Sequence, residues 1–291
     1  MPATVNAGVP RIGPIAEVVI ATHQLDADLA ACERIFGWHA ERREPVTADA
    51  AARWGAPAAA GAPSVTVRPA AGSPGARIRL VESAAPTAYV PLTTYGWAAA
   101  EVIVADVDAV ARAAEAADVE VLGRPTAVGG TDGGTRAGLR AMQIVLPGGA
   151  PLYLTEIGAA PPGFELPRIR DGVGGVFIVV VASPNLEETR GFFEAQFLAR
   201  RVTDHQLAVG VLNRAFHLEP ATPHRVSSLQ LAGEAAIEID QYPAKGRTRS
   251  HEAGELPHGI AAVEFYAVDT SPFEYGPVDG PFGLRLAVVA R

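Results

Sequence analysis

The alternation of apolar and polar positions is clearest near the start of the chain, where Ile15–Thr22 reads IAEVVIAT. Val18 and Ile20 fall on one face of an extended segment, and Glu17 falls on the other. Period-two alternation of this kind predicts a β-strand. We therefore expect a strand that places the carboxylate of Glu17 on an otherwise apolar surface.

The residues that follow predict a helix packed against this strand. Asp26 is placed to cap the start of the helix, and Gly37 is placed to adopt the left-handed conformation that ends it. The apolar positions recur at helical spacing, at Leu25, Leu29, Cys32 and Phe36.

The same strand and helix pattern returns later in the chain, in FIVVVASPNLEETRGFFEAQF at residues 177–197. Leu186, Phe193 and Phe197 match three apolar positions of the first helix at one constant offset. Self-similarity over a long period indicates a duplicated structural unit.

Further strand and helix patterns extend each copy into β-α-β-β-β modules. A first module covers residues 15–82, a second covers 96–157 with a glycine-rich hairpin or lid at 129–134, and a third covers 175–242. The fourth, from residue 259, leaves no room for a helix and two middle strands. A Pro- and Gly-rich stretch separates the second and third modules. We expect a first domain at 1–158, a linker at 159–174 and an incomplete second domain at 175–291.

Composition narrows the class of protein. The chain has 291 residues, of which 48% are hydrophobic and 19% charged, as expected for a folded protein with an ample core. A net charge of −8 excludes a nucleic-acid partner, which requires clustered Lys and Arg. The sequence contains neither a membrane-length apolar stretch nor a secretory signal, so we expect a cytoplasmic protein. The single cysteine, Cys32, is expected to be a core residue.

The module pattern resembles the vicinal oxygen chelate superfamily, which includes glyoxalase I, extradiol dioxygenases and bleomycin-resistance proteins. The resemblance rests on the strand followed by the L-D-x-x-L helix, and on the hairpin P-x-G-x-P-L-x-L-x-E at residues 147–156. It implies an α+β fold in which pairs of modules form curved mixed sheets around a cavity. It also implies that two domains in one chain can form a monomer, although homodimers are common.

Metal enzymes of this superfamily place a ligand on the first and the last strand of each module. The resemblance maps these eight positions onto Glu17, Ala99, Ile178 and Ala262 in first strands and onto Arg79, Tyr153, Glu238 and Arg285 in last strands. A catalytic metal needs about three His or carboxylate ligands. None of the eight is histidine, so we expect no metal and no cofactor.

Two further carboxylates, Glu101 and Glu264, lie at matching places in the second and fourth modules. One interpretation pairs the inward carboxylates with Arg79 or Arg285, since buried charges are rarely left unpaired. The other builds a metal site from Glu17, Glu101 and a loop histidine such as His23.

Without a metal, the resemblance implies a binding protein for an aromatic or polyketide-like natural product, in resistance, sequestration or biosynthesis. The alternative is an isomerase, cyclase or lyase in which Glu17 or Glu101 is the general base and Tyr153 or Arg79 steadies an enolate. We expect one cleft between the two domains to hold the ligand. The candidate ligand-binding residues, on the cleft or on flat stacking surfaces, are Trp38, Trp54, Trp97, Phe192, Glu238 and Glu264.

Overall fold

The computed structural model describes residues 9–86, 88–129, 135–268 and 276–291. The first module consists of β1 (Ile12–Thr22), α1 (Leu25–Phe36), β2 (His39–Pro45), α2 (Ala48–Arg53), the 3-10 turn η1 (Pro57–Ala59), β3 (Pro63–Arg68) and β4 (Arg77–Glu82). The second consists of β5 (Gly96–Val104), α3 (Val107–Ala116), β6 (Glu120–Gly129), β7 (Thr135–Val145) and β8 (Pro151–Ile157).

The third module consists of β9 (Val173–Ser183), α4 (Leu186–Phe197), β10 (Arg200–Leu207), α5 (Gly210–Ala215), β11 (His224–Gln230) and β12 (Ala236–Gln241). Within the described residues, the fourth consists of β13 (Gly259–Ala267), β14 (Gly276–Asp279), the 3-10 turn η2 (Pro281–Gly283) and β15 (Arg285–Val289). The fourth module is therefore abbreviated, as the sequence predicted.

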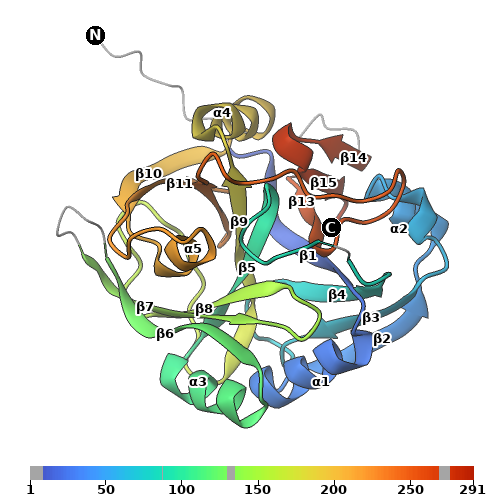
Figure 1. The fold of residues 1–291 in the computed structure, drawn as a ribbon, viewed down its shortest axis with the longest axis horizontal. Helices are drawn as coiled ribbons and strands as arrows, with labels where there is room; N and C mark the ends of the chain where they lie inside the picture. Colours follow the sequence, from blue (N-terminus) through green and yellow to red (C-terminus); the bar gives the residue numbers. More distant parts are fainter. Residues whose placement is uncertain (1–8, 87, 130–134, 269–275) are drawn as a thin grey trace.

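The strands form two mixed sheets (Figure 1). Sheet A has the order β14-β15-β13-β1-β4-β3-β2, and sheet B has the order β10-β11-β12-β9-β5-β8-β7-β6. Sheet A thus combines the first and fourth modules through the antiparallel pair β1 and β13. Sheet B combines the second and third modules through the antiparallel pair β5 and β9. The strand pairing crosses the division between residues 1–158 and 175–291, so each sheet draws on both halves of the chain.

A single hydrophobic core lies between the two sheets. Val18 and Ile20 of sheet A belong to the same buried cluster as Val102 and Leu154 of sheet B, together with apolar residues of α1, α3 and α4. Figure 1 shows α1 and α3 side by side at one end of this core and α4 at the other. Each sheet therefore has a face turned toward this shared core, and an outer face turned away from it.

Most of the features that predicted the first helix are present in α1. Gly37 follows α1 in the left-handed conformation, with φ of 64°. The predicted cap is wrong, because Gln24 occupies that position without a side-chain hydrogen bond, while Asp26 lies in the first turn. The Asp26 carboxylate instead accepts a hydrogen bond from Arg43 Nη2 at 3.0 Å. An acidic residue in the first turn still interacts favourably with the helix dipole.

The sequence analysis did not predict three of the strands, β2, β10 and β14. The strands β2 and β14 form the two edges of sheet A, β10 forms one edge of sheet B, and the side chains of all three are mostly exposed or half-buried. Edge strands commonly carry charged residues and lack an apolar face, so the alternation that predicts a strand is missing. In the part of the chain that the structure describes, no helix is long and apolar enough to cross a membrane.

β6 and β7 pair as an antiparallel hairpin, in line with the hairpin expected around the glycine-rich stretch. Gly130, Gly133 and Gly134 themselves lie outside the described residues.

Candidate functional site

The outer face of sheet B carries two carboxylates on either side of its central strand. Glu101 on β5 lies opposite Tyr153 on β8 and opposite Ile178 on β9. Glu238 on β12 lies opposite Val180, on the other side of β9. Because alternate residues of a strand share a face, these side chains all belong to one surface.

The outer face of sheet A is filled by the protein itself. Helix α2 and Trp54 pack on Val19 and Ala262 of this face. Trp54 is only 1% exposed, and its Nε1 donates a hydrogen bond to Glu264 Oε1 at 2.8 Å. The Arg79 guanidinium lies over the Trp54 ring, 5.5 Å from its centroid. A cation over an indole face is a stabilising contact, so this packing is internally satisfied.

The carboxylates of sheet A are ion-paired. Arg77 Nε donates to Glu17 Oε2 at 2.8 Å, and Arg53 Nε donates to Glu264 Oε1 at 3.3 Å. Burial raises the pKa of Glu17 above 4.5, with repulsion from Glu264 adding to the rise and Arg77 opposing it. The partners are therefore Arg77 and Arg53, rather than Arg79 or Arg285.

Arg79 and Arg285, the two cations proposed as partners, contact other groups. Arg79 donates to Ser64 Oγ from Nε at 3.2 Å and from Nη2 at 3.1 Å. Arg285 Nη1 donates to the Glu255 carbonyl at 2.8 Å. Neither arginine lies on sheet B, so Arg79 cannot steady an enolate formed beside Glu101.

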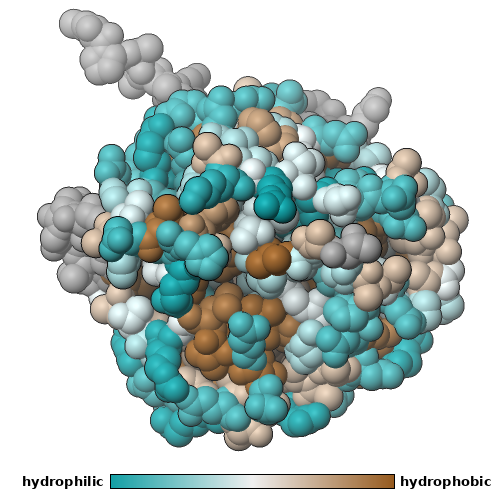
Figure 2. Space-filling model, viewed as in Figure 1, coloured by the Kyte–Doolittle hydropathy of each residue, from teal (hydrophilic) through white to brown (hydrophobic). Residues whose placement is uncertain are grey.

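On sheet B the corresponding surface is hollow. A cavity of about 550 Å³ opens over it, with walls from β6, β7, α5 and the residues just before α5. Its polar lining includes Glu101, Gln143, Tyr153, Thr155 and Glu238. Figure 2 shows hydrophobic residues gathered on the surface in view, in the region of β7 and β8 between α5 and α3.

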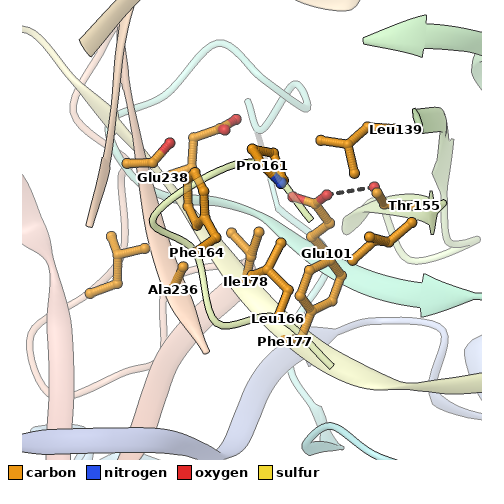
Figure 3. Close-up of a pocket in the computed structure, with 13 residues that line it drawn as sticks. Glu101, Leu139, Thr155, Pro161, Phe164, Leu166, Phe177, Ile178, Ala236 and Glu238 are labelled. Atoms are coloured by element: carbon orange, nitrogen blue, oxygen red, sulfur yellow. Dashed lines mark hydrogen bonds between the residues drawn. The ribbon is translucent and has the colours of Figure 1, made fainter. Parts of the chain in front are cut away.

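Glu101 is held in place by its neighbour on β8. Thr155 Oγ1 donates a hydrogen bond to Glu101 Oε1 at 2.5 Å, drawn as a dashed line in Figure 3. The Thr155 side chain is buried, and the Glu101 side chain is half-buried beside the cavity. A short bond to a carboxylate is typical of a charge-assisted interaction. The carboxylate is thus oriented toward the cavity.

Tyr153 is placed to donate a hydrogen bond inside the cavity. Its side chain is 7% exposed, and burial raises the pKa of the Tyr153 hydroxyl well above 10. Nearby Tyr242, Asp240, Glu238 and Glu101 add to the rise, because each disfavours a second negative charge. Tyr153 therefore stays neutral at physiological pH and keeps its proton.

A second, smaller lobe of about 20 Å³ adjoins the main cavity and shares Glu101, Leu139, Thr155 and Glu238 with it. Its other walls include Pro161, Phe164 and Leu166, from the segment expected to be a linker. Figure 3 shows Glu101 and Glu238 on opposite sides of this lobe, with Phe164 and Ile178 between them. The segment therefore packs on sheet B and closes one end of the cavity.

The structure does not bring the whole predicted site together. Glu101, Tyr153 and Glu238 share the sheet B cavity, whereas Glu17 and Glu264 lie on sheet A. The predicted aromatic residues lie elsewhere: the buried Trp38 Nε1 donates to the Gly174 carbonyl, the buried Trp97 Nε1 donates to the Arg285 carbonyl, and the half-buried Phe192 packs on Phe193 and Phe197. The cleft predicted between the two halves of the chain is thus replaced by the shared core.

The residues at the mapped ligand positions do not fit a catalytic metal. Sheet B presents Ala99, Ile178, Tyr153 and Glu238 there, and sheet A presents Glu17 beside an alanine and two arginines. Across the described residues, no group of three or more His, Cys, Asp or Glu side chains is arranged to hold an ion. A catalytic metal needs about three protein ligands, so no catalytic step in this protein is assigned to a metal.

Sequence reasoning missed several residues of the cavity, notably Gln143, Thr155, Ser228 and Phe164. Gln143 lies opposite Tyr153, and Thr155 lies two residues after Tyr153 on β8, so alternation along β8 from the position that the resemblance gave for Tyr153 points to Thr155. No sequence feature pointed to Phe164, because its segment resembled a solvent-exposed linker.

No family model and no curated protein sequence matches the chain. Solved structures are similar over almost its whole length. Glyoxalase I from Zea mays has a TM-score of 0.59 at 13% identity, covering 95% of this chain and 92% of that chain. A "putative dioxygenase" from Bacillus subtilis subsp. subtilis str. 168 has a TM-score of 0.60 at 14% identity, covering 97% and 86%.

At 13% and 14% identity, this likeness shows the fold alone. The chain therefore has a glyoxalase-like fold built from curved mixed sheets, and the fold predicted from the sequence is confirmed.

Proposed function

We propose that this protein binds one small molecule, an aromatic or polyketide-like natural product, in the sheet B cavity without a metal. The role that fits such binding is resistance, sequestration or an accessory function in biosynthesis. The proposal concerns a single site for each chain, since the equivalent face of sheet A is occupied by Trp54 and α2.

The observation that carries this proposal is the contrast between the two outer faces. The sheet B cavity of about 550 Å³ lies within the range of roughly 300–1,000 Å³ that small-molecule sites occupy. Its walls include apolar side chains such as Leu139 and Ala141, and a few polar groups converge on it from neighbouring strands. A flat apolar ligand fits this combination, with its oxygens directed to Tyr153 and Gln143.

Isothermal titration calorimetry against naphthols, anthraquinones and tetracyclines tests the proposal. We expect saturable binding of at least one compound at one molecule per chain. Glu101→Gln and Tyr153→Phe should each weaken that binding. Arg53→Ala is the matched control, because it removes an ion pair from the filled face of sheet A and should leave affinity unchanged.

Calorimetry is preferable to intrinsic fluorescence for this test. Trp38, Trp54 and Trp97 are 2%, 1% and 1% exposed and line neither lobe of the cavity. A bound molecule would therefore change their emission little. Absence of saturable binding across the panel, or weakening by Arg53→Ala alone, would contradict the proposal.

The bond between Thr155 and Glu101 favours a second candidate function, proton transfer on a ketone or polyketide substrate. An oriented carboxylate can remove a proton next to a carbonyl, and the neutral Tyr153 hydroxyl can donate a hydrogen bond to the resulting enolate oxygen. Together they supply a base and an oxyanion donor in one cavity. The reaction class is isomerisation, cyclisation or elimination.

Deuterium exchange separates this function from binding alone. With 1-tetralone in D₂O, a proton-transfer enzyme should exchange the protons next to the carbonyl faster than buffer does, as measured by proton NMR. Glu101→Gln should abolish the acceleration, while Arg53→Ala should retain it. Equal exchange rates for wild type, Glu101→Gln and buffer would contradict the proton-transfer function and leave only the binding function.

A further inference from the structure

Two hydroxyl groups on the outer face of sheet B are buried without a partner. Ser228 on β11 is 3% exposed, and its Oγ has no hydrogen-bond partner among the described residues. Thr203 lies opposite Ser228 on β10, and its Oγ1 is likewise buried and unpartnered within the described chain. Buried hydroxyls are normally hydrogen-bonded, so these two require an explanation.

Ser228 borders the small lobe of the cavity. It lines this lobe together with Glu101 and Glu238. It also lies directly opposite Glu238 in the antiparallel pair of β11 and β12. Side chains that face each other in such a pair have Cβ atoms roughly 4.5–5.5 Å apart. The Ser228 hydroxyl and the Glu238 carboxylate are therefore close enough to contact the same small group.

The lobe is large enough for one such group. Its volume of about 20 Å³ exceeds the roughly 10–15 Å³ that one water-sized group requires. The remaining walls near it are apolar and include Phe164, Leu166 and Ala236. A single oxygen attached to an apolar body matches both the size and the chemistry of this space.

We propose that the small lobe is a hydroxyl-binding subsite, in which Ser228 and Glu238 recognise one hydroxyl group of the ligand whose body occupies the main lobe. This inference rests on the proposed function, and it narrows the ligand to a hydroxylated aromatic or polyketide. Ser228 donates to the ligand oxygen, and the ligand hydroxyl donates to a Glu238 oxygen. A carboxylate accepts several hydrogen bonds, so other contacts of Glu238 are compatible with this one.

A hydroxyl is favoured over a carbonyl or an ether by the presence of the carboxylate. A carbonyl or ether oxygen can accept from Ser228 but has no proton for Glu238. The lone pairs of such an oxygen repel the carboxylate. The carboxylate loses contact with water when the ligand binds and gains no hydrogen bond in return. A hydroxyl satisfies the donor and the acceptor together.

The test compares two probes and two serine variants. 2-Naphthol carries the hydroxyl, and 2-methoxynaphthalene has the same ring with the proton replaced by methyl. Ser228→Ala removes the subsite hydroxyl. Ser227→Ala is the matched control, because Ser227 is the adjacent residue of β11, faces away from the cavity and already donates to the Thr203 carbonyl at 3.4 Å.

Affinities are measured by NMR titration, with urea unfolding of each variant alongside. We expect wild type to bind 2-naphthol more tightly than 2-methoxynaphthalene. Ser228→Ala should weaken 2-naphthol binding by roughly 2–10-fold, the range that corresponds to one lost neutral hydrogen bond. It should not weaken 2-methoxynaphthalene binding, nor lower stability, since the hydroxyl lacks a partner in the protein. Ser227→Ala should leave both affinities unchanged.

The outcomes separate the two proposals. If neither probe binds, the proposed function fails and this inference fails with it. If the probes bind but Ser228→Ala leaves the affinity for 2-naphthol unchanged, only the subsite is wrong. A loss of stability in Ser228→Ala with unchanged affinity would show that the lobe holds an ordered water only. Equal effects of Ser228→Ala and Ser227→Ala on affinity would also overturn the subsite.

Discussion

Trp54 Nε1 donates a hydrogen bond to Glu264 Oε1 at 2.8 Å, joining the first module to the fourth across sheet A. The bond lies on a fully packed surface, with Glu264 5% exposed. The equivalent surface of sheet B is a cavity. The duplicated modules thus form two unequal halves, one whose outer face is occupied by the protein's own indole and one whose outer face carries a cavity.

Replacing Trp54 with phenylalanine should destabilise the protein by about 1–3 kcal/mol, because Glu264 loses a donor while remaining buried. Urea unfolding measures the change. Trp38→Phe is a matched control, since Trp38 Nε1 donates at 3.1 Å to the neutral Gly174 carbonyl. The loss of stability in Trp38→Phe should be smaller, about 0.5–1.5 kcal/mol, because the hydrogen bond that is lost has a neutral acceptor. Equal losses would show that the charge of Glu264 contributes nothing.

Gly175 at the start of β9 lies against the backbone that leads into β4 of sheet A. Gly175 N donates to the Pro74 carbonyl at 2.7 Å, and a Cβ at Gly175 would lie 2.3 Å from the Ala76 carbonyl oxygen. Gly175→Ala should therefore push backbone segments apart and destabilise the protein by about 1–3 kcal/mol or more. Differential scanning calorimetry should show a lowered melting temperature.

At Gly191, replacement by alanine should have the opposite effect on stability. Gly191 lies inside α4, and a Cβ there has nothing within 4 Å. Gly191→Ala should stabilise the protein by about 0.8–1 kcal/mol through helix propensity. A tolerated Gly175→Ala, with a melting temperature equal to that of Gly191→Ala, would contradict the close packing of the sheets.

His258 should make stability depend on pH. Its Nε2 donates to the Gly148 carbonyl at 2.6 Å, and the same residue is held by Asp28 Oδ1, which accepts from Gly148 N at 2.7 Å. Burial lowers the pKa of His258 below 6.5, and the Gly148 bond opposes that shift. Between the folded pKa and 6.5, the unfolded chain therefore binds more protons than the folded one.

The stability linked to His258 is thus full above pH 6.5 and is lost as the pH falls from 6.5 through the folded pKa. Unfolding free energies measured at a series of pH values should show this loss, and His258→Asn should flatten it in part. His224 contributes in the same direction, because burial also lowers its pKa. His39→Asn, which changes an exposed residue, should leave the profile as in wild type. A steeper loss after His258→Asn would contradict the assignment.

Metal removal should have no effect. The eight mapped positions lack histidine and offer only Glu17 and Glu238 as carboxylates, on different sheets. Protein purified without chelators should carry well under one equivalent of Zn, Fe, Ni or Mn by elemental analysis. EDTA should change neither the melting temperature nor the affinity for 2-naphthol. Stoichiometric metal would contradict this prediction and would favour the alternative site built from carboxylates and a loop histidine such as His23.

Local patterns were sufficient to predict the modules of the fold. The alternation around Glu17, the helix ended by Gly37 and the matching positions around Phe193 depend on neighbouring residues, and all three are present in the structure. In the structure Glu101 and Tyr153 lie opposite each other on β5 and β8 and so share one surface. The alternation did not reveal the edge strands, whose charged side chains carry no such pattern.

Only the tertiary structure decided which modules pair and which face stays open. Sheet A joins Glu17 to Glu264, and sheet B brings Glu101 and Glu238 onto one face, although each pair is far apart in the sequence. Strand pairing over such distances depends on packing of the whole chain, which no local pattern records. Trp54 fills the outer face of sheet A, and Phe164 closes one end of the cavity on sheet B. Both contacts likewise depend on where a loop folds back onto its sheet. The sequence by itself therefore determined the modules and their polar faces, and the packing of distant segments determined that one of the two faces carries a cavity.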